Sequence, residues 1–208
     1  MKVNYIQKYC CDLLSWKEFG SILNITPLMT KSRVNILSMV NYRWHTDAWT
    51  LDKETIPSTI LKECVENYVC YFRDMSRCSE KINKLCQKLE HEYESAFDAH
   101  VYSCKNVSIK HPFGIHYDLN HNVIVQCEGT TNFKIWNEVV DKSTLKHDNL
   151  DIKDDTILDI NLNPGDAVFI PAFYPHLASS ITPRLSVSFP CRYDQTNTKL
   201  KDRNWIEL

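Results

Sequence analysis

Glycine is scarce in this sequence, and long hydrophobic runs are absent. Only 4 of the 208 residues are glycine, which argues against flexible or low-complexity segments. The stretch "MKVNYIQKYCCDLLSWKEF" is interrupted by Lys8 and Asp12, so it lacks the continuous apolar core of a signal peptide. No later run is long enough to span a bilayer. We therefore expect an ordered, soluble, cytoplasmic protein without a membrane partner.

The sequence also lacks a basic cluster. Its formal net charge is −2, and no stretch gathers Lys and Arg as a phosphate-binding face would. A nucleic-acid partner is therefore not expected. The hydrophobic content of 43% and the charged content of 24% are those of an ordinary globular protein, and the length suits one structural domain with a substantial core.

Nine cysteines are present, but their spacing is typical of neither zinc sites nor a disulfide framework. The count is odd, and Cys64, Cys70, Cys78 and Cys86 form no C-x2-4-C pairs. Together with the missing secretory signal, this predicts reduced and mostly buried thiols.

The first 99 residues are predicted to be mainly helical. Ser15 and Glu18 have the spacing of a capping box, which predicts a helix near 15–23. The stretch 33–44 alternates apolar and polar residues and contains no glycine or proline, so a strand is expected there.

Two longer helices are expected after Pro57. Ser58 is a candidate N-cap for a helix whose apolar stripe continues to Phe72. A further apolar stripe predicts a helix over about 79–96. We expect these helices to pack against the part of the chain that follows.

From residue 100 the apolar period changes from helical to alternating. Short β-rich runs are separated by turns, and they read HVYSC, NVIVQC, NFKIW, TILDINL, DAVFI, HLASSI and RLSVSF. In Asn163-Pro164-Gly165-Asp166, proline and glycine occupy the second and third positions of a type II turn. Many short strands at close spacing predict a barrel or a sandwich.

The chain contains two H-x-D pairs, and their contexts differ. No later element obviously completes His45-Thr46-Asp47, so we expect a structural or surface role for it. His116-Tyr117-Asp118 precedes a predicted strand in which Asn122 and Gln126 share one face. Polar residues on the inner face of a barrel need a reason, and a metal site supplies one.

His176 is the third candidate ligand. It follows a tight turn and an apolar strand that ends in proline-bounded sequence. Two imidazoles and one carboxylate on one face of an octahedral metal leave three positions open, which suits non-haem Fe(II) and oxygen chemistry. Zinc would more typically use a tetrahedral site.

"FGIHYDLNHNVIVQCEGTTNFKIW" followed by "LNPGDAVFIPAFYPHLASSITPRLSVSFP" resembles the Jumonji-C and cupin-like 2-oxoglutarate oxygenases. The resemblance covers residues 100–190 and implies a double-stranded β-helix there. With the mainly helical region expected over 1–99 and a tail over 191–208, we expect an α+β fold. The resemblance also implies a dioxygenase that uses Fe(II), 2-oxoglutarate and O2, and that hydroxylates a protein side chain or a small molecule.

The resemblance also assigns roles to individual residues. His116, Asp118 and His176 match the iron ligands of the family. Asn122 matches an asparagine that lies beside the cosubstrate in several members, and Tyr102 resembles a tyrosine that bonds the tail of 2-oxoglutarate.

The sequence departs from the family pattern at two positions. His100 stands where the family has an asparagine. Thr131 stands where the family has a lysine that pairs with the far carboxylate of 2-oxoglutarate. A threonine donates one neutral hydrogen bond, which does not replace a charge-assisted one.

Arg184 is our predicted replacement for the missing lysine. Strand alternation places Arg184 and Ser186 on one face, and a guanidinium binds a carboxylate bidentately. Lys134 is the second candidate, in a register where its face points inward in place of that of Thr131. Two other functions stay open: a non-catalytic cupin-like binding module, and a metal cupin enzyme that does not use 2-oxoglutarate.

Overall fold

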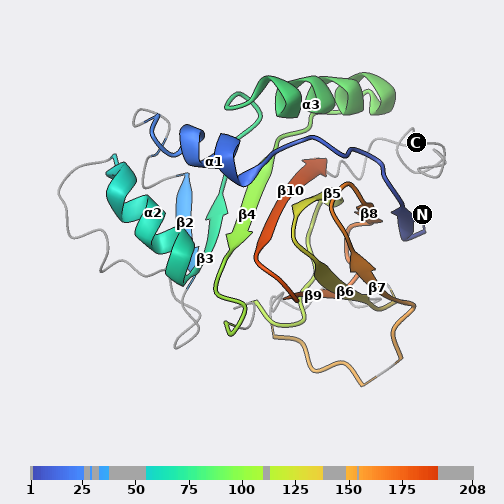
Figure 1. Ribbon diagram of the computed structural model, residues 1–208. Coiled ribbons are helices and arrows are strands. Elements are labelled where there is room, and N and C mark those ends of the chain that lie inside the picture. Colours follow the sequence, from blue (N-terminus) through green and yellow to red (C-terminus); the bar gives the residue numbers. More distant parts are fainter. Residues whose placement is uncertain are drawn as a thin grey trace.

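The computed structural model contains two antiparallel sheets and three helices within the residues that it describes (Figure 1). The described residues are 2–25, 29, 33–37, 55–109, 113–137, 149–153 and 155–191. The helices are α1 (Trp16–Ile22), α2 (Ser58–Asn67) and α3 (Glu80–Tyr93). The strands are β1 (Asn4–Ile6), β2 (Val34–Leu37), β3 (Val69–Phe72), β4 (His100–Cys104), β5 (His121–Glu128), β6 (Thr131–Ile135), β7 (Leu158–Leu162), β8 (Ala167–Ile170), β9 (His176–Ser180) and β10 (Arg184–Cys191).

The larger sheet has seven strands and the smaller has three. Their orders are β1-β8-β5-β10-β4-β3-β2 and β7-β6-β9. Each of the seven runs predicted from residue 100 onward forms one of the strands β4 to β10, so this part of the prediction is confirmed.

Both faces of the larger sheet are covered. On β5, Val123 and Val125 join a core with Phe19 of α1, Leu61 of α2 and Leu89 of α3. Alternate residues of β5 and β8 pack instead against the smaller sheet, in a second core of Ile124, Phe133, Ile135, Leu162, Val168, Ile170 and Ala178. Alternation along each strand therefore separates a helix-facing side from a side that faces the smaller sheet.

The first 99 residues contribute more strand than the sequence predicts. β2 lies within the predicted strand 33–44, whereas β1 and β3 were not expected as strands, and all three join the larger sheet. Within the predicted strand 33–44, Val34–Leu37 forms β2, and residues 38–44 lie outside the described part.

The helix predicted to continue to Phe72 ends at Asn67. Tyr68 is extended, with φ −133° and ψ 165°, and Val69–Phe72 pairs with β2 and β4. The N-cap is Pro57, not Ser58, which is the first helical residue. The stretch Val69–Phe72 contains β-branched and aromatic residues, which favour a strand over a helix. Its pairing with β2 and β4 therefore outweighs the helical period of its apolar residues.

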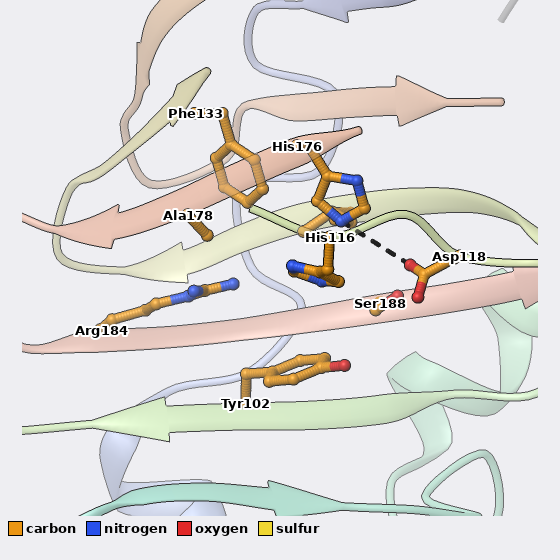
Figure 2. Close-up of a pocket in the computed structure, with 9 residues that line it drawn as sticks. Tyr102, His116, Asp118, Phe133, His176, Ala178, Arg184 and Ser188 are labelled. Atoms are coloured by element: carbon orange, nitrogen blue, oxygen red, sulfur yellow. Dashed lines mark ion pairs between the residues drawn. The ribbon is translucent and has the colours of Figure 1, made fainter. Parts of the chain in front are cut away.

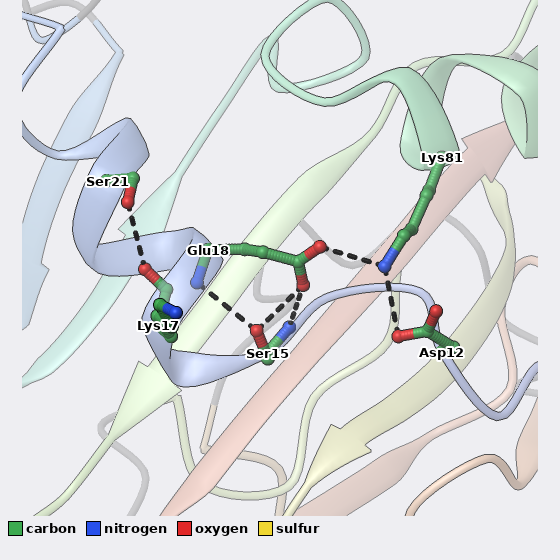
Figure 3. Close-up of polar contacts among 6 residues, drawn as sticks. All are labelled: Asp12, Ser15, Lys17, Glu18, Ser21 and Lys81. Carbon is green, nitrogen blue, oxygen red and sulfur yellow. Dashed lines mark hydrogen bonds and ion pairs between the residues drawn. The ribbon is translucent and has the colours of Figure 1, made fainter.

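α1 begins with the predicted capping box, which Figure 3 shows together with its neighbours. The backbone N–H of Glu18 donates to Ser15 Oγ at 3.2 Å, and the Ser15 N–H donates to Glu18 Oε2 at 2.8 Å. Lys81 of α3 donates to Glu18 Oε1 at 2.8 Å and to Asp12 Oδ1 at 3.0 Å. The bonds from Lys81 and from Ser15 lower the pKa of the Glu18 carboxyl to about 2. The capping residue Glu18 thus also links α1 to α3 through its ion pair with Lys81.

The predicted type II turn precedes β8. The Asp166 N–H donates to the Asn163 carbonyl at 2.9 Å, and Gly165 has φ +92°, a conformation that favours glycine. The buried Asp166 carboxylate accepts from the Tyr5 hydroxyl at 2.9 Å. The turn therefore fixes both the start of β8 and its neighbour β1.

The cysteines are free thiols, as predicted. Five are buried, three are half-buried and Cys11 is exposed. Within the described part of the chain, no helix combines the length and the apolar character that a membrane span requires.

Candidate metal centre and adjoining pocket

The structure brings His116, Asp118 and His176 together, and we call these residues the triad (Figure 2). His116 and His176 form an antiparallel bridge in which each backbone N–H donates to the other residue's carbonyl, at 3.0 and 2.7 Å. Their ring centroids are 4.3 Å apart, and His176 Nε2 lies 3.7 Å from Asp118 Oδ2. Ligand atoms of the triad all lie within 4.8 Å of one another. A backbone bridge therefore positions both imidazoles.

The backbone also fixes the tautomer of each histidine. His116 Nδ1 lies 3.1 Å from the Gly114 carbonyl oxygen, and His176 Nδ1 lies 3.0 Å from that of Tyr174. A carbonyl oxygen only accepts, so each Nδ1 carries the hydrogen. In its neutral form, each imidazole then has its lone pair on Nε2, and a hydrogen bond from the other ring nitrogen is usual for histidine ligands of metals.

His176 is uncharged at neutral pH. Burial lowers its pKa to about 4, and the neighbouring His116 adds to that effect, while Asp118 opposes it. Only 3% of the surface of His176 is exposed. A neutral imidazole is the form that binds a metal.

Asn122 holds Asp118 and is itself held by Ser188. Asn122 Nδ2 donates to Asp118 Oδ2 at 2.6 Å, and Ser188 Oγ donates to Asn122 Oδ1 at 3.1 Å. Because an ionised carboxylate only accepts, the amide nitrogen must face Asp118 and the amide oxygen must face Ser188. The buried Asn122 therefore orients the carboxylate, which explains one of the polar residues on the inner face of β5.

Gln126, the other polar residue on that face, supports a turn. Its Nε2 donates to the carbonyls of Glu128 at 2.8 Å and Gly129 at 3.2 Å. Gly129 has φ +72°, and a Cβ there would lie 1.9 Å from the Pro183 carbonyl oxygen. This turn sets where β6 begins.

A pocket adjoins the triad, and Arg184 extends into it in Figure 2. The other lining residues are Tyr102, Ile124, Phe133, Ala178 and Ser188. The Arg184 guanidinium carbon lies 5.5 Å from the ring centroids of both Tyr102 and Phe133, and its Nε donates to Ser186 Oγ at 3.0 Å. Both rings are within cation–π distance of the guanidinium.

Arg184 is a buried cation without a carboxylate partner in the described part of the chain. It is 4% exposed, and burial lowers its pKa to about 10, so it stays charged at neutral pH. Buried charges are normally paired, because an unpaired one loses its hydration without compensation. The buried guanidinium beside the triad is therefore a candidate site for an anion.

Thr131 and Lys134 lie on opposite faces of β6. Thr131 is fully buried on the inward face that it shares with Phe133, and its hydroxyl has no hydrogen-bond partner among the described residues. Lys134 is on the outer face, where its Nζ lies 3.4 Å from Asp159 Oδ2 and its side chain is 45% exposed. The second choice for the carboxylate ligand, Lys134, is therefore wrong, because the strand register turns Thr131 and not Lys134 inward.

Tyr71 lies behind Tyr102 and was not a sequence candidate. These residues are directly opposite on β3 and β4, and their ring centroids are 4.6 Å apart. The Tyr71 hydroxyl is hydrogen-bonded to His100 Nδ1, and His100 Nε2 lies 3.3 Å from Asp98 Oδ2. Pairing between two strands that are separated by residues 73–99 leaves no local sequence signal.

Asp74, Asp98 and His100 also place possible ligand atoms within 4.8 Å of one another. Both ring nitrogens of His100 are already engaged, and Arg33 Nε lies 3.8 Å from Asp74 Oδ2. We interpret this group as a hydrogen-bonded cluster. His45-Thr46-Asp47 lies outside the described residues.

Two facing antiparallel sheets with a histidine, aspartate and histidine cluster at one end define a cupin-like metal-binding domain. A family model of the JmjC domain matches residues 74–199. The chain belongs to the JmjC domain family.

Solved structures of YcfD from Escherichia coli are similar in fold. The complex of this ribosomal oxygenase with cobalt and 2-oxoglutarate has a TM-score of 0.64 and 14% identity over 94% of this chain and 49% of that chain. The complex with cobalt and succinic acid has a TM-score of 0.63 and 16% identity, over 94% of this chain and 49% of that chain. A further crystal structure of YcfD has a TM-score of 0.66 and 15% identity, again over 94% of this chain and 49% of that chain. This chain thus spans about half the length of those proteins, and a search of curated proteins finds no match.

Proposed function

We propose that this protein is an Fe(II)- and 2-oxoglutarate-dependent oxygenase built on a double-stranded β-helix. The observation that carries the proposal is the buried Arg184, a cation with no carboxylate partner among the described residues, in the same pocket as the triad. A metal ligand set alone would suit many cupins. A metal ligand set beside a dedicated anion site suits a small carboxylate that reaches the metal from the pocket.

The triad fits Fe(II) by the chemistry of its donors. Two Nε2 lone pairs and one oriented carboxylate oxygen form a facial set that leaves three positions open. Bound Fe(II) would supply the oxygen chemistry, with 2-oxoglutarate oxidised to succinate and carbon dioxide. Cobalt with 2-oxoglutarate or with succinic acid in the YcfD structures supports this choice.

Arg184 would hold the far carboxylate of 2-oxoglutarate. Its guanidinium makes cation–π contacts with Tyr102 and Phe133, and its Nε donates to Ser186, which leaves the terminal nitrogens for a bidentate contact with the carboxylate. The inward hydroxyl of Thr131 would add a neutral hydrogen bond. The positive charge that relatives carry at the position of Thr131 would thus come from β10 in this chain.

The pocket has an apolar wall, and one side of the metal centre is open to solvent. Ile124, Phe133 and Ala178 are apolar and buried, so they would exclude water from the cosubstrate. The side chain of Asp118 is 43% exposed, so the open side of the metal centre lies there. A substrate would approach from that side, and the likeness to a ribosomal oxygenase favours a protein side chain over a small molecule as the hydroxylated group.

Succinate formation tests the proposal. Protein supplied with Fe(II), ascorbate and 2-oxoglutarate should release succinate, and His176→Ala should not. A non-catalytic binding module predicts metal binding with no 2-oxoglutarate binding. A metal cupin that does not use 2-oxoglutarate predicts that Arg184→Ala leaves metal binding and activity intact, whereas our proposal predicts retained metal and lost 2-oxoglutarate affinity.

A further inference from the structure

A tight turn just before His176 contains an unusual backbone conformation. The Tyr174 N–H donates to the Pro171 carbonyl at 3.3 Å, which closes the turn. Phe173, at the third position of this turn, has φ +67°. A positive φ at the third position is the feature of a type II turn, where glycine or asparagine is the usual residue. Phe173 therefore occupies a position that favours glycine.

A phenylalanine is costly in this conformation. In the left-handed region the Cβ of an L-residue comes too close to the following carbonyl oxygen, and a bulky residue there is a genuine outlier. Among the non-glycine residues with positive φ in the described part of the chain, Phe173 is the only one with an aromatic side chain. Strain of this kind persists only where the surrounding structure enforces it, and it concentrates at functional sites.

The side chain of Phe173 is buried in a small apolar cluster. Its members are Tyr117, Leu150, Ala172 and Phe173, and we call it the Phe173 cluster. Phe173 is 7% exposed, and its ring centroid lies 6.0 Å from that of Tyr117. Leu150 is half-buried, and its N–H donates to the Ile115 carbonyl at 2.8 Å. Burial of the ring in this cluster offsets the strain of the turn.

The Phe173 cluster joins the two chain segments that carry the triad. Tyr117 separates His116 from Asp118 in the sequence. The Phe173 N–H donates to the Asp118 carbonyl at 2.9 Å. The backbone bridge between His116 and His176 links the same two segments at a second point. The segments are therefore held together by backbone bonds at two points and by the contact between the two rings.

Asp118 depends on this support because its side chain is half-exposed. The side chain of His176 is 4% exposed and that of Asp118 is 43% exposed, so packing constrains the carboxylate less than the imidazole. The position of the carboxylate then follows that of its backbone. The Phe173 N–H and the ring of Phe173 against Tyr117 hold that backbone.

We propose that Phe173 is a positioning residue that sets the place of Asp118 in the metal centre through its ring. A glycine would serve the turn without strain, so the ring is the part of Phe173 that the metal centre uses. The inference rests on the proposed function, because it concerns the same metal centre. It extends that centre to a residue outside the lining of the pocket.

Two substitutions measure the strain. Phe173→Ala and Phe173→Gly both remove the ring, but only glycine also removes the Cβ that φ +67° disfavours. Phe173→Gly should therefore unfold at a temperature about 2–4 °C higher than Phe173→Ala. Alanine is the more stable of the two at a position with ordinary φ. That order, or equal unfolding temperatures, would overturn the strain on which the inference depends.

Binding of Co(II) measures the positioning. Co(II) is titrated into the protein in competition with a chelator, and its visible absorption at saturation reports the geometry of its ligands. Phe173→Gly should weaken Co(II) binding at least about tenfold, as is typical when a group that orients a metal ligand is lost. Its absorption spectrum should also differ from that of the wild type. Phe173→Leu, which restores apolar bulk against Tyr117, should recover most of the affinity.

Phe97→Ala is the matched control. Phe97 is 8% exposed, and its ring centroid lies 5.9 Å from that of Tyr93 in the core shared with the helices. Its loss should lower the unfolding temperature and leave the affinity and the spectrum of Co(II) unchanged. Leu150→Ala removes a half-buried member of the Phe173 cluster. It should weaken Co(II) binding in the same direction, even if Phe173→Gly does not fold.

The outcomes separate this inference from the proposed function. Wild-type affinity and spectrum in both Phe173→Gly and Leu150→Ala would overturn the positioning role and leave the proposed function standing. Binding by Phe173→Leu that is no tighter than binding by Phe173→Gly would also overturn the role of the ring. Failure of the wild type to bind Co(II) would overturn both.

Discussion

Replacing Arg184 with methionine should stabilise the ligand-free protein and remove its affinity for 2-oxoglutarate. The guanidinium is buried among aromatic rings without a carboxylate partner in the described part of the chain. Methionine has a similar length and fills the same space between the rings without a charge. Opposite effects on stability and on binding are typical of a residue kept for function.

The expected gain in stability follows from the pKa. Burial lowers the pKa of Arg184 from 12.5 to about 10, which corresponds to about 3 kcal/mol against the charged form in the folded state. Methionine loses the cation–π contacts, worth about 1 kcal/mol, and the bond to Ser186, worth about 1 kcal/mol. The net expectation is a gain of about 1 kcal/mol, or roughly 2–4 °C in Tm for a protein of this size.

Two assays on the same preparation test this expectation. Thermal and urea unfolding without metal or ligand should show the Arg184→Met protein to be slightly more stable than the wild type. Titration of its Fe(II)-loaded form with 2-oxoglutarate should show affinity reduced at least about 100-fold, the value of a lost bidentate charged contact. A variant that is several kcal/mol less stable and binds 2-oxoglutarate normally would refute the reasoning and make Arg184 a structural residue.

Three further predictions concern the metal and the fold. His176→Ala should abolish stoichiometric Fe(II) binding in a chelator competition assay, while His45→Ala should bind like the wild type; the reverse result would contradict the ligand assignment. Glu18 has a lowered folded-state pKa of about 2, so its stabilising contribution is present above its ordinary pKa and is lost as the pH falls toward 2. The urea midpoint of the wild type should therefore fall more steeply with acid than that of Glu18→Gln, and parallel curves would show that the cap contributes nothing. Gly129→Ala should destabilise by more than about 1 kcal/mol, because a Cβ would lie 1.9 Å from the Pro183 carbonyl oxygen at φ +72°, and an unchanged unfolding curve would count against the turn geometry.

Motif order and strand alternation predicted much of the candidate site. His116, Asp118 and His176 come together as their spacing before and after the predicted strands indicates. On β10, Arg184 faces the pocket, while Leu185 joins the core shared with the helices. A period of two is a strong local signal, so the face of each residue could be predicted once the strand was identified.

The parts that sequence reasoning missed depend on contacts between distant segments. Val69–Phe72 continues a helical stripe, yet it forms β3 because β2 and β4 supply strand partners on both sides. The register of β6, which turns Thr131 inward and Lys134 outward, is set by its pairing with β7 and β9. Neither partner can be recognised from the local sequence.

The central claim is that the triad and Arg184 form one site for Fe(II) and 2-oxoglutarate. The most direct measurement is an oxygen-free titration of the Fe(II)-loaded protein with 2-oxoglutarate, followed by the visible absorption that appears when a 2-oxo acid chelates Fe(II). The absorption should grow and saturate at one equivalent in the wild type, require far more 2-oxoglutarate in Arg184→Met, and be absent in His176→Ala. Tight Fe(II) binding without this absorption at any 2-oxoglutarate concentration would contradict the claim.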